Sequence, residues 1–270
     1  MKEDDINTIW QVPKYLPYVQ PNLTDDIIAN AEKKIGYKLP KEYINILRIQ
    51  NGGYIRFRLP ETSNEQIYGI GPFFPSLTDY DWTDYEGTVG FELNGLVPFD
   101  GDGHWYLCLD YRHNKTQPEI TFIDTESDYE KPIAKNFQEY LKLLEIDADN
   151  EFVIATTFTI EELVTKISSI ADIKFEEPNS FDHGYPIYRS KYNDSWVWIS
   201  PNKVPSGFIR ESDDRYEELK SQMLPTSLRH PEISSAFIFI NVSDDLQRQN
   251  LFDILTRQDI KISEAKAYFE

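Results

Sequence analysis

The feature that most constrains the fold of this chain is a pair of short helices that ends abruptly at Asn51-Gly52-Gly53. Thr24 is a good N-cap for the first helix, whose apolar residues recur at helical spacing until Gly36 ends it. Pro40 suits the first turn of the second helix. Both glycines after Asn51 can take the positive φ values that a sharp reversal needs. The sequence therefore predicts two consecutive short helices, followed by a sharp reversal into the first strand signal.

Short strand signals follow the reversal, at residues 54–59, 88–92, 105–111 and 120–124. Pro132 then opens a third predicted helix, which keeps apolar residues on one side as far as Leu144. The order helix, helix, strands, helix is typical of an α+β domain with an antiparallel sheet and helices packed on it.

An acidic segment at residues 145–151 marks the predicted domain boundary. We expect a first domain at 1–148, which begins with a proline- and aromatic-rich arm, and a second domain at 149–270. Thr159 and Glu162 form a capping box in front of a helix, and residues 236–242 are typical of a buried central strand. Ser243 is the predicted N-cap of a final helix. The second domain is therefore also predicted to be α+β, with a role that the sequence leaves open.

The segment 59–111 contains no Lys or Arg, although cations flank it on both sides. It carries ten Asp or Glu residues and eleven aromatic residues. Folded domains usually intersperse the two charge signs, because like charges on one surface repel each other. Two interpretations stay open: the aromatic residues form a sheet core beneath a solvated acidic face, or the segment is a working surface.

Composition narrows the classes of partner. The chain has 270 residues, a net charge of −19 and a pI near 4.6, so nucleic acids and acidic membranes are expected to be repelled and basic partners attracted. No apolar run has the length of a membrane span, the N-terminus lacks the apolar core of a signal peptide, and the single Cys108 excludes an internal disulfide. These features predict a cytoplasmic protein whose oligomeric state is undetermined.

Three blocks in the first half carry a family resemblance. The run 35–43, with Leu47 and the Asn-Gly-Gly stop, resembles the signature of the SUKH superfamily, which includes bacterial immunity proteins and a yeast regulator of cell-wall synthesis. Residues 96–103 followed by 106–110 look like the central hairpin of that family, and residues 136–141 look like its closing helix. The resemblance covers roughly residues 23–145 and none of the second domain.

The resemblance implies a SUKH-like antiparallel sheet with helices packed on it, and a binding activity without catalysis or cofactor. Bacterial members of this kind bind and neutralise a cognate toxin. The partner implied here is therefore a toxin domain. A nuclease toxin carries cations to hold phosphate, so an acidic surface rich in aromatic residues suits it as a nucleic-acid mimic. The predicted contact residues are Asp79, Asp81, Trp82, Asp84, Tyr85, Glu86, Glu92, Asp100 and Asp102.

Two alternatives remain at this stage. The yeast relative suggests a regulatory scaffold that binds several host proteins through the second domain. The second alternative is a metal-dependent enzyme that uses Asp100, Asp102 and His104, because carboxylates and an imidazole suit a hard or borderline cation. Against a metal, Asp-Gly-Asp-Gly between two apolar segments is ordinary turn chemistry. No nucleophile motif or phosphate-binding glycine loop is present in the sequence, so we expect a protein that is not an enzyme and holds no metal.

Overall fold

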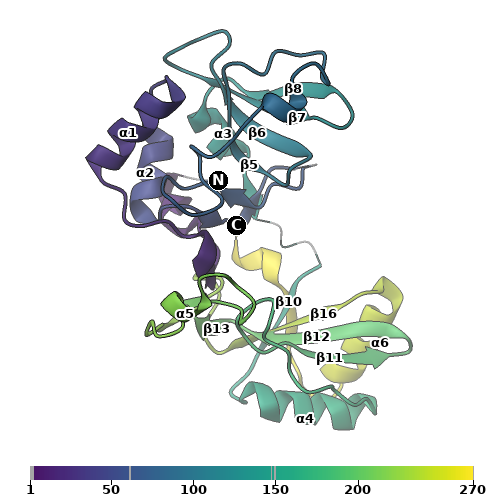
Figure 1. The fold of residues 1–270 in the computed structure, drawn as a ribbon. Coiled ribbons are helices and arrows are strands. Elements are labelled where there is room, and N and C mark those ends of the chain that lie inside the picture. The colour runs from purple at the N-terminus through teal and green to yellow at the C-terminus, as the bar shows by residue number, and fades with distance from the viewer. Residues whose placement is uncertain (1–2, 61, 147, 149, 270) are drawn as a thin grey trace. The chain divides into compact units, whose positions relative to one another are not determined.

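The structure is a computed structural model that describes residues 3–60, 62–146, 148 and 150–269 (Figure 1). The chain divides into two compact units, residues 1–147 and 148–270. We predicted a domain boundary between residues 148 and 149. Residues 147 and 149, which flank residue 148, lie outside the described part of the chain. Each unit combines helices with antiparallel strands, so the predicted α+β class is confirmed.

The helices of the first unit are η1 (Glu3–Thr8), η2 (Leu16–Tyr18), α1 (Asp25–Ile35), α2 (Lys41–Ile49), η3 (Thr83–Tyr85) and α3 (Phe137–Leu143). Its strands are β1 (Lys14–Tyr15), β2 (Gly53–Tyr54), β3 (Phe57–Arg58), β4 (Gln66–Ile67), β5 (Leu96–Gly101), β6 (Trp105–Asp110), β7 (Glu119–Asp124), β8 (Tyr129–Ala134) and β9 (Glu145–Ile146).

Local chemistry sets the ends of α1 as predicted. The Thr24 side chain accepts a hydrogen bond from the backbone of Ile27, and Gly36 ends the helix with a φ of 82°. Asp25 and Asp26 lie in the first turn, and two lysines lie in the last, so both ends suit the helix dipole. The sequence prediction of this helix is confirmed at both ends.

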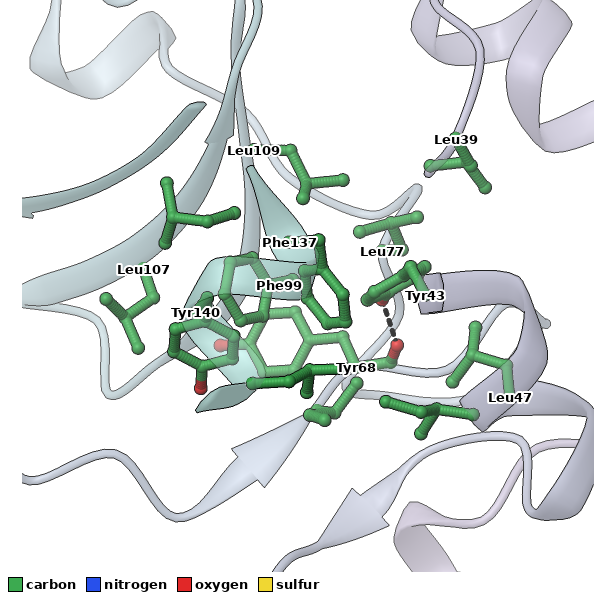
Figure 2. Close-up of a cluster of buried hydrophobic side chains, with 14 of the residues drawn as sticks. Leu39, Tyr43, Leu47, Tyr68, Leu77, Phe99, Leu107, Leu109, Phe137 and Tyr140 are labelled. Atoms are coloured by element: carbon green, nitrogen blue, oxygen red, sulfur yellow. Dashed lines mark hydrogen bonds between the residues drawn. The ribbon is translucent and has the colours of Figure 1, made fainter. Parts of the chain in front are cut away.

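The main sheet of the first unit is a four-stranded antiparallel meander in the order β5-β6-β7-β8. One face packs against α1, α2 and α3 around Tyr43, Phe99, Phe137 and Tyr140, all of which are almost completely buried. Figure 2 shows these rings meeting, with the Tyr43 hydroxyl donating a hydrogen bond to the carbonyl of Tyr68. This core holds the helix pair and the strands together, as the order of elements predicted.

Two local predictions in the first unit are wrong. Residues 88–92, expected to be a strand, form an irregular loop. The third helix begins at Phe137, with the Asn136 side chain as its N-cap, and not at Pro132. Pro132 lies in β8, the edge strand of the sheet, where a missing backbone N–H is tolerated. Residues 132–134 therefore form a strand paired with β7, although their apolar spacing had suggested a helix.

The helices of the second unit are α4 (Ile160–Ala171), α5 (Tyr216–Leu219), α6 (Asp245–Thr256) and η4 (Ala265–Tyr268). Its strands are β10 (Phe152–Ala155), β11 (Tyr188–Tyr192), β12 (Ser195–Pro201), β13 (Lys203–Pro205), β14 (Gly207–Phe208), β15 (Thr226–Leu228), β16 (Phe237–Val242) and β17 (Ile262–Glu264).

The second unit is built on a five-stranded sheet in the order β11-β12-β16-β10-β17, with α4 and α6 packed on one face. Strand β16 is central, as the continuous apolar run predicted. The capping box of Thr159 and Glu162 is present at the start of α4. The cap of α6 is Asp244 and not Ser243, because the Asp244 carboxylate accepts the hydrogen bond from Gln247.

Candidate partner-binding surface

An acidic loop, residues 79–95, covers the face of the β5–β8 sheet opposite the three helices. Trp82 and Tyr85 of this loop are half-buried against Tyr106 of β6, and the ring centroids of Trp82 and Tyr106 are 5.1 Å apart. The Trp82 Nε1 group donates a hydrogen bond of 3.0 Å to a carbonyl of β5, and the Tyr85 hydroxyl donates one of 2.8 Å to the carbonyl of Gly103. The aromatic side chains therefore attach the loop to the sheet.

The carboxylates of the acidic loop are exposed. They belong to Asp79, Asp81, Asp84, Glu86 and Glu92. The hydroxyl and the backbone N–H of Thr83 donate to Asp81 at 2.5 and 2.9 Å, and these bonds hold the pKa of the Asp81 carboxyl below its usual range. No Lys or Arg occurs in the loop, so its surface is negative. The rings pack on the sheet and the acids face solvent, as the first of the two interpretations expected. That this segment is a working surface stays a prediction.

Asp100 is a correction to the predicted contact set, because its side chain is buried in β5 and only 1% of the residue is exposed. Its carboxylate accepts backbone N–H bonds from Glu65 at 3.1 Å, Gln66 at 3.4 Å and Gly101 at 2.8 Å. Burial raises the pKa of Asp100 well above its usual range, although these N–H bonds act in the opposite direction. The carboxylate joins β4 to β5, next to a register shift after Pro98, and cannot contact a partner.

Asp102 and His104 lie in the exposed β5–β6 turn, but Asp100 does not join them as a metal ligand. Asp102 accepts the backbone N–H bonds of His104 at 2.9 Å and Trp105 at 3.1 Å, which is turn chemistry. Among the residues that the structure describes, no group of three or more His, Cys, Asp and Glu side chains is arranged to hold a metal. The metal-dependent alternative therefore loses its proposed site.

Cys108, the single thiol, does not form a reactive site. It lies in β6 with no exposed surface, and burial raises the pKa of its thiol well above the usual range. A thiol that is both buried and protonated is a packing group, as its position in an apolar strand pattern suggested.

The sequence prediction missed a third acidic segment, the β7–β8 turn with Glu126 and Asp128. The Asp128 carboxylate accepts the backbone N–H of Gly90 in the acidic loop at 2.5 Å, and Glu126 lies 2.7 Å from Nδ1 of His104. The antiparallel meander brings this turn beside the β5–β6 turn, because alternate turns lie at the same end of the sheet. We define the acidic surface as the exposed carboxylates of the acidic loop together with Asp102, Glu126 and Asp128.

The signal for this third segment was the acid-rich run 124–130 between two strands. The run lies outside the cation-free segment only because Arg112 and Lys115 separate the two in sequence. Arg112 does not neutralise the acidic loop, since its guanidinium already pairs with the buried Asp110 at 2.7 Å and with Glu130 at 2.7 Å. The acidic surface is therefore assembled from three segments that only the sheet topology brings together.

Within the described part of the chain, no helix has the length and apolar composition needed to cross a bilayer. A comparison with known families matches residues 22–143 to the SMI1 / KNR4 family (SUKH-1). This match spans α1 to α3 and includes the whole β5–β8 sheet and the acidic loop. No curated protein matches the chain.

Proposed function

The first unit carries a domain of the SMI1 / KNR4 family (SUKH-1), and from this premise we propose that the chain is an immunity protein that binds and neutralises a cognate toxin. Bacterial members of this family are immunity-type proteins that bind partner proteins. The fold supports this proposal, because the first unit offers a four-stranded sheet with a loop packed on the face opposite its helices. The role of the second unit is not part of this proposal.

The acidic surface is the observation that supports a basic partner. Its exposed carboxylates come from three segments that are tied together by the bonds of Tyr85 to Gly103, Gly90 to Asp128 and Glu126 to His104. Carboxylates held at fixed positions pair with Lys or Arg of a partner and speed its approach through long-range attraction. A nuclease toxin uses cations to hold phosphate, so its groove is the kind of surface that this face complements.

Reversing two charges of the acidic loop is expected to weaken the toxin complex. Asp84→Lys with Glu86→Lys is preferred to a change at Asp81, because Asp81 also holds Thr83 in place. We expect a dissociation constant about tenfold or more higher at low salt, since each exposed pair contributes up to about 1 kcal/mol and the lysines add repulsion. The difference is expected to shrink towards 0.5 M salt, because salt screens exposed charges. The titrant is the C-terminal domain of a secreted protein, if the adjoining reading frame encodes one, and calorimetric titration measures the change in dissociation constant.

A matched control carries Asp214→Lys and Asp253→Lys, two exposed acids of the second unit, and so has the same change in net charge. It is expected to bind within about threefold of the unaltered protein at physiological salt. If the control weakens binding as much as the loop variant, net charge and not the acidic surface governs the complex. Absence of any binding between the unaltered protein and the toxin domain contradicts the proposed function itself.

A further inference from the structure

A second loop of the first unit, residues 69–76, holds the ring of Phe74 in solvent. Phe74 is 71% exposed, the largest value for a phenylalanine, tyrosine or tryptophan among the described side chains. Its ring touches protein at the edge of Tyr18, with the centroids 6.3 Å apart and the planes at 84°. A large apolar side chain left in water loses the free energy that its burial would supply. Single exposed apolar residues are common on protein surfaces, so the case for a role of Phe74 depends on how its loop is held.

Two buried amide side chains fix the backbone of this loop. Gln20, which is 4% exposed, accepts the N–H of Phe73 at 3.1 Å and donates to the carbonyls of Phe73 and Pro75, the latter at 3.1 Å. Asn51, which is 3% exposed, accepts the N–H of Ile70 at 2.8 Å and donates to its carbonyl at 2.9 Å. The backbone on both sides of the exposed ring is therefore held by groups that use their hydrogen-bonding capacity for that purpose.

Gly71 of this loop lies so close to the Gln20 side chain that no larger residue fits at its position. A Cβ added there would lie 2.3 Å from Oε1 of Gln20, so the amide can reach the loop only where a side chain is missing. The conformation that displays Phe74 thus depends on the close approach of Gln20 and Gly71. A ring displayed on a fixed backbone loses little conformational entropy when a partner covers it.

We propose that Phe74 is the apolar anchor of the toxin complex and enters an apolar pocket of the toxin domain beside the cations that contact the acidic surface. This inference rests on the proposed function. Asp79 is five positions after Phe74, so the two Cα atoms are about 18 Å apart at most. An interface of ordinary size covers about 800 Å² per partner, or roughly 30 Å across, so the distance from Phe74 to Asp79 is short enough for one partner to contact both. Binding energy in such interfaces concentrates in a few aromatic residues that fill a pocket.

The test is calorimetric titration of the toxin domain into Phe74→Ala. We expect a dissociation constant about 30-fold higher, as for a typical anchor residue. This loss is expected to be the same at 0.05 and 0.5 M salt, because burial of a ring is not screened, whereas the loss in Asp84→Lys/Glu86→Lys shrinks with salt. Since the ring is exposed, the thermal unfolding midpoint of Phe74→Ala should stay within about 2 °C of the unaltered protein. Phe158→Ala, at a 44% exposed phenylalanine of the second unit, is the matched control and should bind within about twofold.

A double-mutant cycle tests the positioning role of Gln20. Gln20→Ala is expected to weaken binding when Phe74 is present and to have no further effect in the Phe74→Ala background, because the amide acts through the ring. A change below threefold in Phe74→Ala, together with the expected loss in the charge-reversal variant, overturns the anchor and leaves the proposed function standing. If the unaltered protein does not bind the toxin domain, the proposed function and the anchor both fall.

Discussion

Replacing Arg112 with alanine is expected to lower the free energy of unfolding of the first unit by about 3–5 kcal/mol, because it leaves a buried carboxylate without its cation. The Arg112 guanidinium makes two bonds to Asp110, at 2.7 and 2.9 Å, and the Asp110 side chain is only 2% exposed. The same guanidinium donates to the carbonyl of Glu92 at 3.1 Å, at the end of the acidic loop. Hydrogen exchange of the β5 and β6 amides measures the change in this unit alone.

The control for this substitution is the double variant Asp110→Asn/Arg112→Ala. Removing the charge of Asp110 removes the uncompensated carboxylate, so the double variant should be more stable than Arg112→Ala. Arg112→Ala alone within about 1 kcal/mol of the unaltered protein would mean that solvent or another group already neutralises Asp110.

The contribution of the Asp110–Arg112 pair to the stability of the fold is expected to decrease at acidic pH. Burial opposes ionisation of Asp110, but the bonds from Arg112 and from the Thr121 hydroxyl hold the pKa of Asp110 below its usual range. A carboxyl with a lowered folded-state pKa stabilises the fold above its unfolded-state pKa of about 4, and that stabilisation is lost as the pH falls through the folded-state value. Comparing pH 7 with pH 3, the unaltered protein should therefore lose more stability than Arg112→Ala.

The helix ends show which parts of the fold are determined by residues close together in the sequence. Thr24, Gly36 and the capping box at Thr159 act within one turn of chain, so sequence spacing was enough to locate them. The start of the third helix, in contrast, depends on a strand pairing with residues distant in the sequence. Ile133 has a helix-like spacing to the residues after it, yet it belongs to β8 because residues 120–124 of the neighbouring strand pair with that segment. A pairing between distant segments leaves little trace in the spacing of either one.

The acidic surface also combines features that the sequence showed with features that only the fold determines. The alternation of acid and ring around Trp82 was visible in the sequence, and the structure separates it into rings on the sheet and carboxylates in solvent. Asp100 and Asp102 look alike in the sequence, but only Asp100 meets the backbone of β4, which lies about 35 residues earlier. Glu126 and Asp128 join the surface only through the order of the strands. Exposure at a site therefore depends on register, which composition does not encode.

Gly52→Ala is the second substitution with a large expected effect on stability, about 2–5 kcal/mol. Gly52 has a φ of +91°, which costs any other residue about 1–2 kcal/mol. In addition, a Cβ at this position would lie 2.5 Å from the backbone N of Gly69 and 2.7 Å from its Cα. Backbone atoms cannot rotate away as a side chain does, so relief of this clash displaces the start of the Phe74 loop and costs about 1–3 kcal/mol more.

Gly36→Ala separates the two causes, because Gly36 has a similar φ of +82° but no atom within 4 Å of an added Cβ. Both substitutions restrict the unfolded chain to the same degree, so that contribution cancels in the comparison. Gly36→Ala should therefore cost only about 1–2 kcal/mol. Urea unfolding of the two variants, followed by exchange of the α2 amides, measures the difference. Equal losses would show that backbone strain alone makes Gly52 necessary, and that the contact with Gly69 relaxes without cost.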